Sequence, residues 1–238
     1  MTRVTINGMK NLILLFILLG YSTVWAANSG GKGQRNQGVY VEETFFPVYV
    51  LKNDTESPAG GSATKAVPTQ TGWGLDTRTT AGYVWWGVLL GITYNYYNVS
   101  SSRPRTNDYE GLKEVTDRNE FGATAGYLFT HWRLTFTYFL LANKTFTQTY
   151  TDGVTGSVTT DETRKNTDGS GYQIGVGYDF ALGAGWGLSP TLLYRNVIYS
   201  KQSYTVRTGT GTPHSMTALQ TKAIDSELRP MITLNKIF

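Results

Sequence analysis

Hydrophobic and polar residues alternate over long stretches of the chain after residue 38. In residues 86–96 the even positions carry Trp, Val, Leu, Ile, Tyr and Tyr, whereas the odd positions carry Gly, Leu, Gly, Thr and Asn. The segments 132–142 and 172–182 show the same period of two, again with mostly apolar even positions. A period of two is typical of a β-strand whose two faces meet different environments. The pattern therefore predicts long strands, each with one apolar and one polar face.

Eight stretches of this kind predict eight strands. They span residues 39–51, 73–85, 86–96, 119–129, 132–142, 172–182, 186–198 and 224–238. Most are about 11 residues long, which matches the roughly 9–11 residues that a tilted strand needs to cross a membrane. A strand of a soluble protein averages only about 5–6 residues. The phase of the first strand is not determined by its pattern, because it carries Glu42 next to Glu43 and then a run of apolar residues.

The connections between these strands are alternately short and long. Tight connections are expected at residues 85–86, 130–131 and 183–185, and long polar connections at 53–70, 100–117, 147–169 and 202–221. Asp152-Gly153 is a hairpin-turn dipeptide, so the strands beside the third loop are expected to project beyond a membrane. Tight turns at one end and loops at the other are typical of an outer-membrane barrel. The predicted fold is therefore all-β, an eight-stranded antiparallel up-and-down transmembrane β-barrel.

Aromatic residues gather near the ends of the predicted strands, and Leu, Ile and Val fill the middles. Amphipathic rings prefer the boundary between lipid and water, so two aromatic girdles are expected around an aliphatic band. The predicted girdle residues are Trp73, Tyr83, Trp85, Trp86, Tyr94, Tyr96, Trp132, Tyr178 and Trp186.

The opposite phase of the strands carries charged residues of both signs. Assignment by parity places five acids and five arginines on this inner face: Asp76, Glu120, Asp179, Asp225, Glu227, Arg78, Arg118, Arg133, Arg195 and Arg229. Charges held away from bulk water must be paired, and an eight-stranded barrel is just wide enough for side chains to fill it. We therefore predict an ion network that closes the lumen.

The N-terminal segment has the features of a secretory signal peptide. A positive start is followed by the apolar run Leu12–Gly20 and by Val24-Trp25-Ala26, a small-residue exit suited to cleavage. The run is too short to span a bilayer, which needs about 20 residues. The predicted organisation is a signal peptide at 1–26, a flexible periplasmic leader at 27–38 and the barrel at 39–238.

Composition removes several classes of function. The 238 residues include no Cys, which excludes a disulfide scaffold, a thiolate metal site and a cysteine nucleophile. Without Arg3 and Lys10 of the signal peptide, 19 basic residues face 17 acidic ones, and no basic run suggests nucleic-acid binding. The modest mean hydropathy of −0.26 is the average of a lipid-facing half and a polar half of each strand.

No constellation of residues points to catalysis, a metal or a cofactor. His131 and His214 are expected at opposite ends of the barrel, so they cannot share a metal ion or a proton relay. Asp225 and Glu227 share a face at positions i and i+2, and an ion network with Arg229 explains them better than a catalytic dyad. We therefore expect a protein that is not an enzyme.

The predicted chain resembles the small eight-stranded outer-membrane barrels of the OmpA/OmpX type over residues 39–238. Such barrels end in Phe after alternating apolar residues, as Phe238, Leu234 and Ile232 do here, whereas Lys236 and Pro230 depart from that pattern. The resemblance implies that Phe238 is a C-terminal assembly signal read by the barrel-assembly machinery. It also implies a monomer among outer-membrane lipid and lipopolysaccharide of a Gram-negative bacterium, with extracellular loops and periplasmic termini.

Three prolines fall within predicted strands that are consecutive around the barrel closure: Pro47, Pro190 and Pro230. Proline cannot donate to a strand ladder, so these residues mark either β-bulges or a weakened seam through which an apolar ligand could leave sideways.

Three functions are compatible with this sequence. The first is a structural or surface-interaction protein that presents four long extracellular loops. The alternative is a narrow channel for ions or small apolar solutes. A third is a soluble lipocalin-like binder, which would have the reverse polarity, with an apolar interior.

Overall fold

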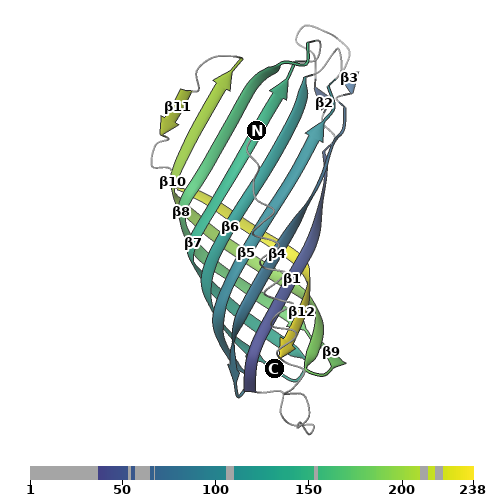
Figure 1. The fold of residues 1–238 in the computed structure, drawn as a ribbon, viewed down its shortest axis with the longest axis vertical. Coiled ribbons are helices and arrows are strands. Elements are labelled where there is room, and N and C mark those ends of the chain that lie inside the picture. Colours follow the sequence, from purple (N-terminus) through teal and green to yellow (C-terminus); the bar gives the residue numbers. More distant parts are fainter. Residues whose placement is uncertain are drawn as a thin grey trace.

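Eight long strands form a closed antiparallel ring (Figure 1). The computed structural model describes residues 37–52, 55–56, 65–66, 68–105, 110–152, 155–209, 214–217 and 222–238. The ring strands are β1 (Gln37–Lys52), β4 (Gln70–Trp85), β5 (Val88–Arg103), β6 (Gly111–Leu128), β7 (Trp132–Thr151), β8 (Val158–Tyr178), β10 (Trp186–Thr208) and β12 (Ala223–Ile237). Four short strands accompany them: β2 (Thr55–Glu56), β3 (Lys65–Ala66), β9 (Phe180–Gly183) and β11 (His214–Thr217).

The ring joins strands that follow one another in sequence, and β12 closes it against β1. The all-β, eight-stranded antiparallel up-and-down barrel predicted from the alternation is therefore confirmed. Within the described ranges no helix is long and apolar enough to span a bilayer. The predicted signal peptide and most of the predicted leader lie outside the described residues.

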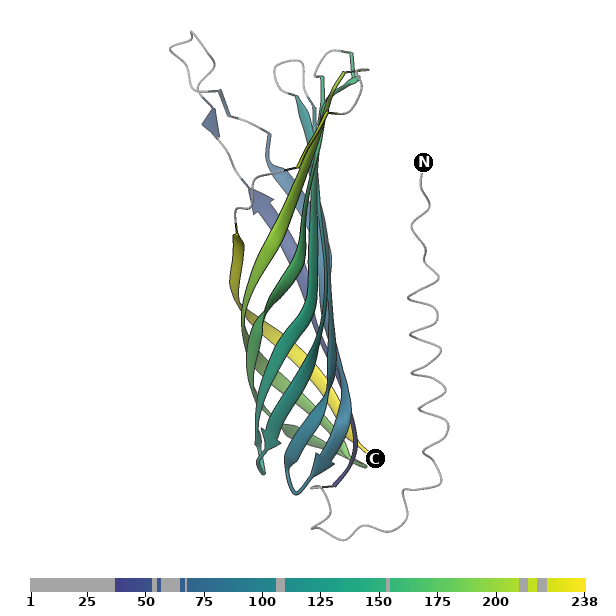
Figure 2. The same cartoon turned by 90° about the vertical axis from the view of Figure 1, so that its left-hand side faces the viewer.

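The strands are longer than predicted, and most of the extra length lies at the end opposite the tight turns (Figure 2). β6 begins at Gly111, β7 continues to Thr151 and β10 continues to Thr208. Much of the predicted loops 100–117, 147–169 and 202–221 is therefore strand, and those loop boundaries were wrong. In these extensions polar residues occupy both faces, so no alternation marks them as strand.

The tight turns have the backbone conformation that short hairpins require. Trp86 and Gly87 have φ values of 50° and 81°, as in a two-residue type I′ turn between β4 and β5. The turn before β10 also uses three consecutive residues with positive φ, Gly183, Ala184 and Gly185.

The two faces of the ring have opposite polarity. Outward side chains are apolar and exposed, such as Leu90 at 64%. Inward side chains are polar and buried, as in a row of four threonines, Thr80, Thr93, Thr124 and Thr137, that hydrogen-bond from strand to strand. This polarity is the reverse of that of a soluble lipocalin-like barrel.

A β-bulge in β7 changes the phase of that strand. Leu140 and Leu141 both point outward, and Ala142 is buried inside, although its even number predicts an outward position. The pairing with β8 shifts at this point and shifts again near Asp168, whose φ is 53°. Beyond the bulge the even positions of β7 face the lumen, so the predicted orientation of Ala142 was wrong.

Gly74 allows β4 and β5 to approach closely. A Cβ atom at this position would collide with the carbonyl oxygen of Asn98 and with Val99 on β5. On its other side Gly74 pairs with Val48 of β1.

The closure between β1 and β12 is the shortest pairing in the ring. It covers six residue pairs, from Tyr40 with Ile237 to Phe45 with Ile232. By comparison, β1 pairs with β4 over its whole length, from Gln37 to Lys52.

Candidate functional site

The lumen holds two groups of ion pairs, and the lower one lies nearer the tight turns. Glu42 of β1 forms ion pairs with two arginines, with Arg78 Nη1 and Arg133 Nη1 each 3.3 Å from a carboxylate oxygen. Arg133 also lies 3.5 Å from Asp179. We call Glu42, Arg78, Arg133 and Asp179 the lower layer. Glu42 and both arginines are fully buried.

Neutral groups of β1 supply hydrogen bonds to Glu42 in the lower layer. The hydroxyl group of Tyr40 donates to Glu42, and Arg133 donates to the Tyr40 oxygen at 3.1 Å. Thr44 donates to the other Glu42 oxygen at 3.1 Å. These residues come from alternate positions of β1, which share the inward face. The buried carboxylate therefore has the partners that its desolvation requires.

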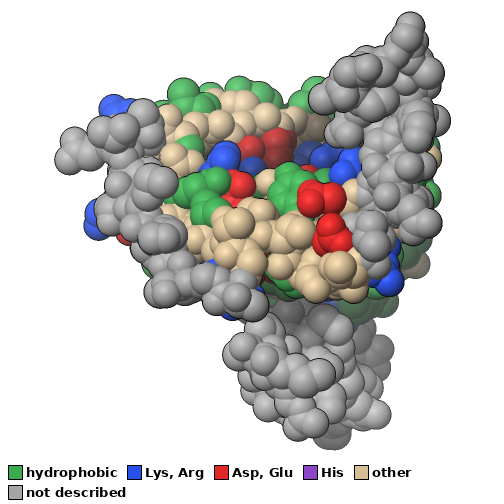
Figure 3. Space-filling view, turned by 90° about the horizontal axis from the view of Figure 1, so that it is seen from above, with side chains coloured by type: hydrophobic (Ala, Val, Ile, Leu, Met, Phe, Trp, Pro, Cys, Tyr) green, Lys and Arg blue, Asp and Glu red, His purple; other side chains and the backbone are tan. Residues whose placement is uncertain are grey.

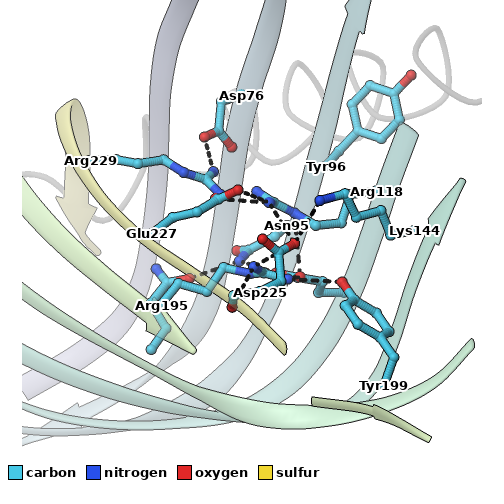
Figure 4. Close-up of polar contacts among 12 residues, drawn as sticks. Asp76, Asn95, Tyr96, Arg118, Lys144, Arg195, Tyr199, Asp225, Glu227 and Arg229 are labelled. Carbon is cyan, nitrogen blue, oxygen red and sulfur yellow. Dashed lines mark hydrogen bonds and ion pairs between the residues drawn. The ribbon is translucent and has the colours of Figure 1, made fainter. Parts of the chain in front are cut away.

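The upper group of ion pairs centres on Glu120 of β6, and Figure 4 labels its partners Arg118 and Arg195. Arg195 Nε donates to Glu120 at 2.7 Å, and Arg118 Nε lies 3.3 Å from the same oxygen. Arg118 also contacts Glu227 of β12 at 2.9 Å. Asn95 donates to Glu120 at 3.0 Å. The residues come from four different strands, so the group links opposite walls of the barrel.

Asp225 and Arg229 extend this group on β12. Asp225 lies 3.0 Å from Lys144 Nζ and 3.2 Å from Arg195 Nη1. Arg229 pairs with both Asp76 and Glu227. We call the full set the upper layer, which consists of Asp76, Arg118, Glu120, Lys144, Arg195, Asp225, Glu227 and Arg229.

Each layer is electrically balanced. The lower layer has two carboxylates and two arginines, and the upper layer has four carboxylates and four cations. A cavity of about 10 Å³ remains where they meet, lined in part by Asp76, Arg78 and Arg229. That volume suits about one water molecule. Seen from above, charged side chains occupy the centre of the ring (Figure 3).

The structure brings all ten predicted lumen residues into these two layers. Sequence reasoning missed Glu42 and Lys144. The ambiguous phase of the first strand concealed Glu42, which points inward, while Glu43 points outward and accepts a hydrogen bond from Thr79. Lys144 was missed because the bulge at Leu140–Leu141 reverses the phase of β7.

A smaller polar cluster lies at the end of the lumen away from the tight turns. Glu114 accepts from Lys52 at 2.9 Å and from Gln70 and Gln148 at 2.7 Å each. Partial burial acts to raise the pKa of Glu114, but these three hydrogen bonds and the charge of Lys52 outweigh it and hold the pKa below its ordinary value. The carboxylate therefore stays ionised and ties β1, β4, β6 and β7 together.

All nine predicted girdle residues point away from the lumen. Seven are exposed, Trp73 most of all at 77%, while Tyr96 and Tyr178 are half-buried. Near the tight turns, Trp132 packs edge-on against Tyr178 with ring centres 5.1 Å apart.

The C-terminus lies at the same end of the barrel. The backbone N–H of Phe238 donates to the carbonyl of Val39 at 2.9 Å. Lys236 Nζ lies 4.8 Å from the ring centre of Trp186 and 4.3 Å from that of Phe238. The lysine that departs from the usual terminal pattern therefore bridges two aromatic rings.

The two histidines lie far apart. His131 is in the tight turn before β7, with its ring stacked on Tyr178 at 5.8 Å. His214 begins β11, which pairs with β10 at the opposite end. Within the described ranges no group of three or more His, Asp or Glu side chains has the arrangement of a metal site.

Comparison with known proteins gives distant structural likeness only. No protein-family model and no curated protein sequence matches the chain. The crystal structure of Neisserial surface protein A is 14% identical, covering 84% of this chain and 97% of its own, with a TM-score of 0.33. The solid-state NMR structure of outer membrane protein AlkL in DMPC bilayers is 14% identical, covering 88% and 94%, with a TM-score of 0.39.

Proposed function

We propose that the chain is an integral outer-membrane β-barrel that acts as a non-conducting scaffold at the cell surface. The membrane location is supported by the inverted polarity of the ring, with exposed Leu, Ile and Val outside and buried Thr, Glu and Arg inside. Water would not favour so large an apolar exterior. A closed barrel satisfies its backbone hydrogen bonds internally, as lipid requires.

The closed lumen is the observation that carries the scaffold function. Two electrically neutral layers of buried ion pairs cross it, and the space where they meet holds about one water molecule. A permeating ion would have to break several of these pairs, which are costly to separate in a low-dielectric interior. We therefore favour a surface scaffold over the alternative of an axial ion channel.

The scaffold would present its long strand extensions outside the cell. In the proposed orientation the tight turns and both termini face the periplasm, and β7, β8 and β10 project with their loops. These extensions carry mixed charges, such as Arg164 paired with Glu162 and Lys201 paired with Asp168. Exposed loops on a rigid barrel are suited to recognition. The proposed surroundings are outer-membrane lipid and lipopolysaccharide, and the proposal includes no catalytic step.

Planar-bilayer recording of the refolded protein tests this function. Wild type is expected to be electrically silent, after insertion is verified by heat-modifiable migration on a gel. A charge-balanced variant that combines Glu42→Thr and Arg133→Thr with Glu120→Thr and Arg195→Thr removes one ion pair from each layer and is expected to conduct. The matched control removes an exposed pair, Glu162→Thr with Arg164→Thr, and should remain silent. Steady conductance of inserted wild type would overturn the proposal.

A further inference from the structure

The barrel wall is incomplete above the closure of β1 and β12. Their pairing ends at Phe45 and Ile232, although β1 continues to Lys52 and β12 extends back to Ala223. The two strands diverge above this point, β1 toward β2 and β3, and β12 toward β10 and β11 (Figure 1). We call the opening between residues 46–52 of β1 and 223–231 of β12 the notch.

Two prolines explain where the pairing stops. The register pairs Thr44 with Thr233 and Phe45 with Ile232, so its continuation would place Pro47 opposite Pro230. Neither residue has an N–H to donate, and proline in a sheet is tolerated at an edge that needs no donor. Both prolines keep their pairing on the other side, with Leu75 and Leu192, without a shift of register. The expected β-bulges at these prolines are therefore absent from these ladders.

Pro190 behaves differently from the other two. It pairs with Ile232 inside the continuous ladder between β10 and β12. Its position therefore does not border the notch, which makes it a matched control.

The β1 side of the notch is apolar on both faces. Phe46, Val48 and Val50 point toward the lumen and are partly exposed. Tyr49 and Leu51 point outward and are 69% and 58% exposed. A strand that separates lipid from a polar lumen alternates in polarity. This segment does not alternate, and for that reason its phase could not be assigned from sequence.

The outer face of the β12 side is apolar as well, whereas its inner face carries Asp225, Glu227 and Arg229 of the upper layer. Leu228 and Ile224 point outward and are 64% and 66% exposed. Behind this strand, Val197 and Tyr199 of β10 form a buried apolar cluster against which Ala223 packs. The lipid-facing surface thus reaches both edges of the notch, and on the lumen side only the β1 edge is apolar.

The notch begins within the depth of a membrane. Gln37 lies at the tight-turn end of the barrel, and Phe45 is eight residues further along β1. At about 3.3 Å per residue and a tilt of about 40°, this corresponds to a height of about 20 Å. The apolar band of such barrels is about 25 Å tall, so the lowest part of the notch lies in the outer leaflet.

We propose that a hydrocarbon chain of an outer-leaflet lipid occupies the notch along its β1 edge, the edge that is apolar on both faces. This inference rests on the proposed membrane location but is independent of whether the lumen conducts. Because Pro47 and Pro230 have no backbone N–H, fewer unpaired polar groups face the hydrocarbon chain. Phe46 and Val48 contact the hydrocarbon chain on the lumen side.

Fluorescence quenching tests this site, and the absence of cysteine in the chain allows single-cysteine labelling. The fluorophore bimane is attached at Val48→Cys, and the protein is refolded into dioleoylphosphatidylcholine vesicles containing phosphatidylcholine brominated on the acyl chains. Quenching by the brominated chains is expected to match that of a label at lipid-facing Leu90→Cys. Bromine quenching of the Val48 label should be several-fold stronger than that of a label at Gln148→Cys, in the polar cluster around Glu114. Aqueous iodide should quench the Val48 label weakly.

Closing the notch provides the second measurement. Pro47→Thr with Pro230→Thr restores two donors and should extend the pairing, which reduces bromine quenching at Val48→Cys several-fold. Pro190→Thr should leave it unchanged. Strong iodide quenching at Val48 would mean a water-filled notch, and no quenching by either agent would mean coverage by protein, such as a second copy. Each result overturns the proposal. Absence of bromine quenching at Leu90 would instead refute the membrane location.

Discussion

Glu42 on β1 lies 3.3 Å from Arg133 on β7, although these strands are not neighbours in the ring. The ion pair therefore crosses the lumen and joins the closing strand to the far wall. It lies at the level of the six-residue closure between β1 and β12, where backbone pairing is shortest. Side-chain contacts through the interior thus reinforce the part of the ring with the fewest backbone hydrogen bonds.

Replacing Glu42 by Ala should destabilise the barrel strongly. The change leaves Arg78 and Arg133 buried without their shared carboxylate, and breaking a buried pair costs about 3–5 kcal/mol. Urea unfolding in lipid vesicles measures the effect. The control, Glu162→Ala, removes the carboxylate of the partly exposed pair with Arg164 and should cost less than about 1 kcal/mol. Equal effects of the two changes would show that the lower layer contributes little to stability.

Gly74→Ala should also destabilise the barrel, for a steric reason. The new Cβ would collide with the backbone of Asn98 on β5, so the two strands must separate locally. The expected cost is about 1–3 kcal/mol. Ala125→Val adds volume on the lipid-facing side and should change stability by less than about 0.5 kcal/mol. Normal stability of Gly74→Ala would contradict the close approach of β4 and β5.

Deletion of Phe238 should reduce the amount of inserted barrel. The deletion removes the hydrogen bond to Val39 and the ring that Lys236 contacts, and it removes the proposed signal for the barrel-assembly machinery. The heat-modifiable fraction in isolated outer membranes measures insertion. Phe180→Ala removes another exposed ring near the same end and is the control. If both variants insert equally well, Phe238 has no special role in assembly.

The polar cluster at the mouth should make stability depend on pH. In the folded barrel the pKa of Glu114 lies below its ordinary value. The stability that its ionised carboxylate contributes is therefore fully present at any pH above that ordinary value. It is lost as the pH falls below the ordinary glutamate pKa and through the lowered folded pKa. The contribution should be under about 1 kcal/mol, because water screens the cluster. The difference in unfolding free energy between wild type and Glu114→Gln should therefore shrink on acidification. If this difference in unfolding free energy did not change with pH, Glu114 would not be the source of the pH dependence.

Local patterns in the sequence determined the number of strands and the polarity of their faces. An alternation such as that of residues 86–96 depends only on the backbone geometry of one strand, so it can be recognised without knowledge of its neighbours. The aromatic residues at strand ends and the inward arginines can also be recognised from one strand alone, because residues two positions apart lie on the same face of a strand. Where the local rule is interrupted, as at Leu140 and Leu141, the orientation of Ala142 was predicted wrongly and Lys144 was missed.

The tertiary structure alone decided which charges meet and where the ring remains open. Glu42 pairs with Arg78 and Arg133 because the register of several successive ladders brings three strands around one point in the lumen. That register is a property of the closed ring and is not encoded in any single strand. For the same reason, only the closing register of β1 and β12 shows that its continuation would place Pro47 opposite Pro230, and the pairing ends before these two residues.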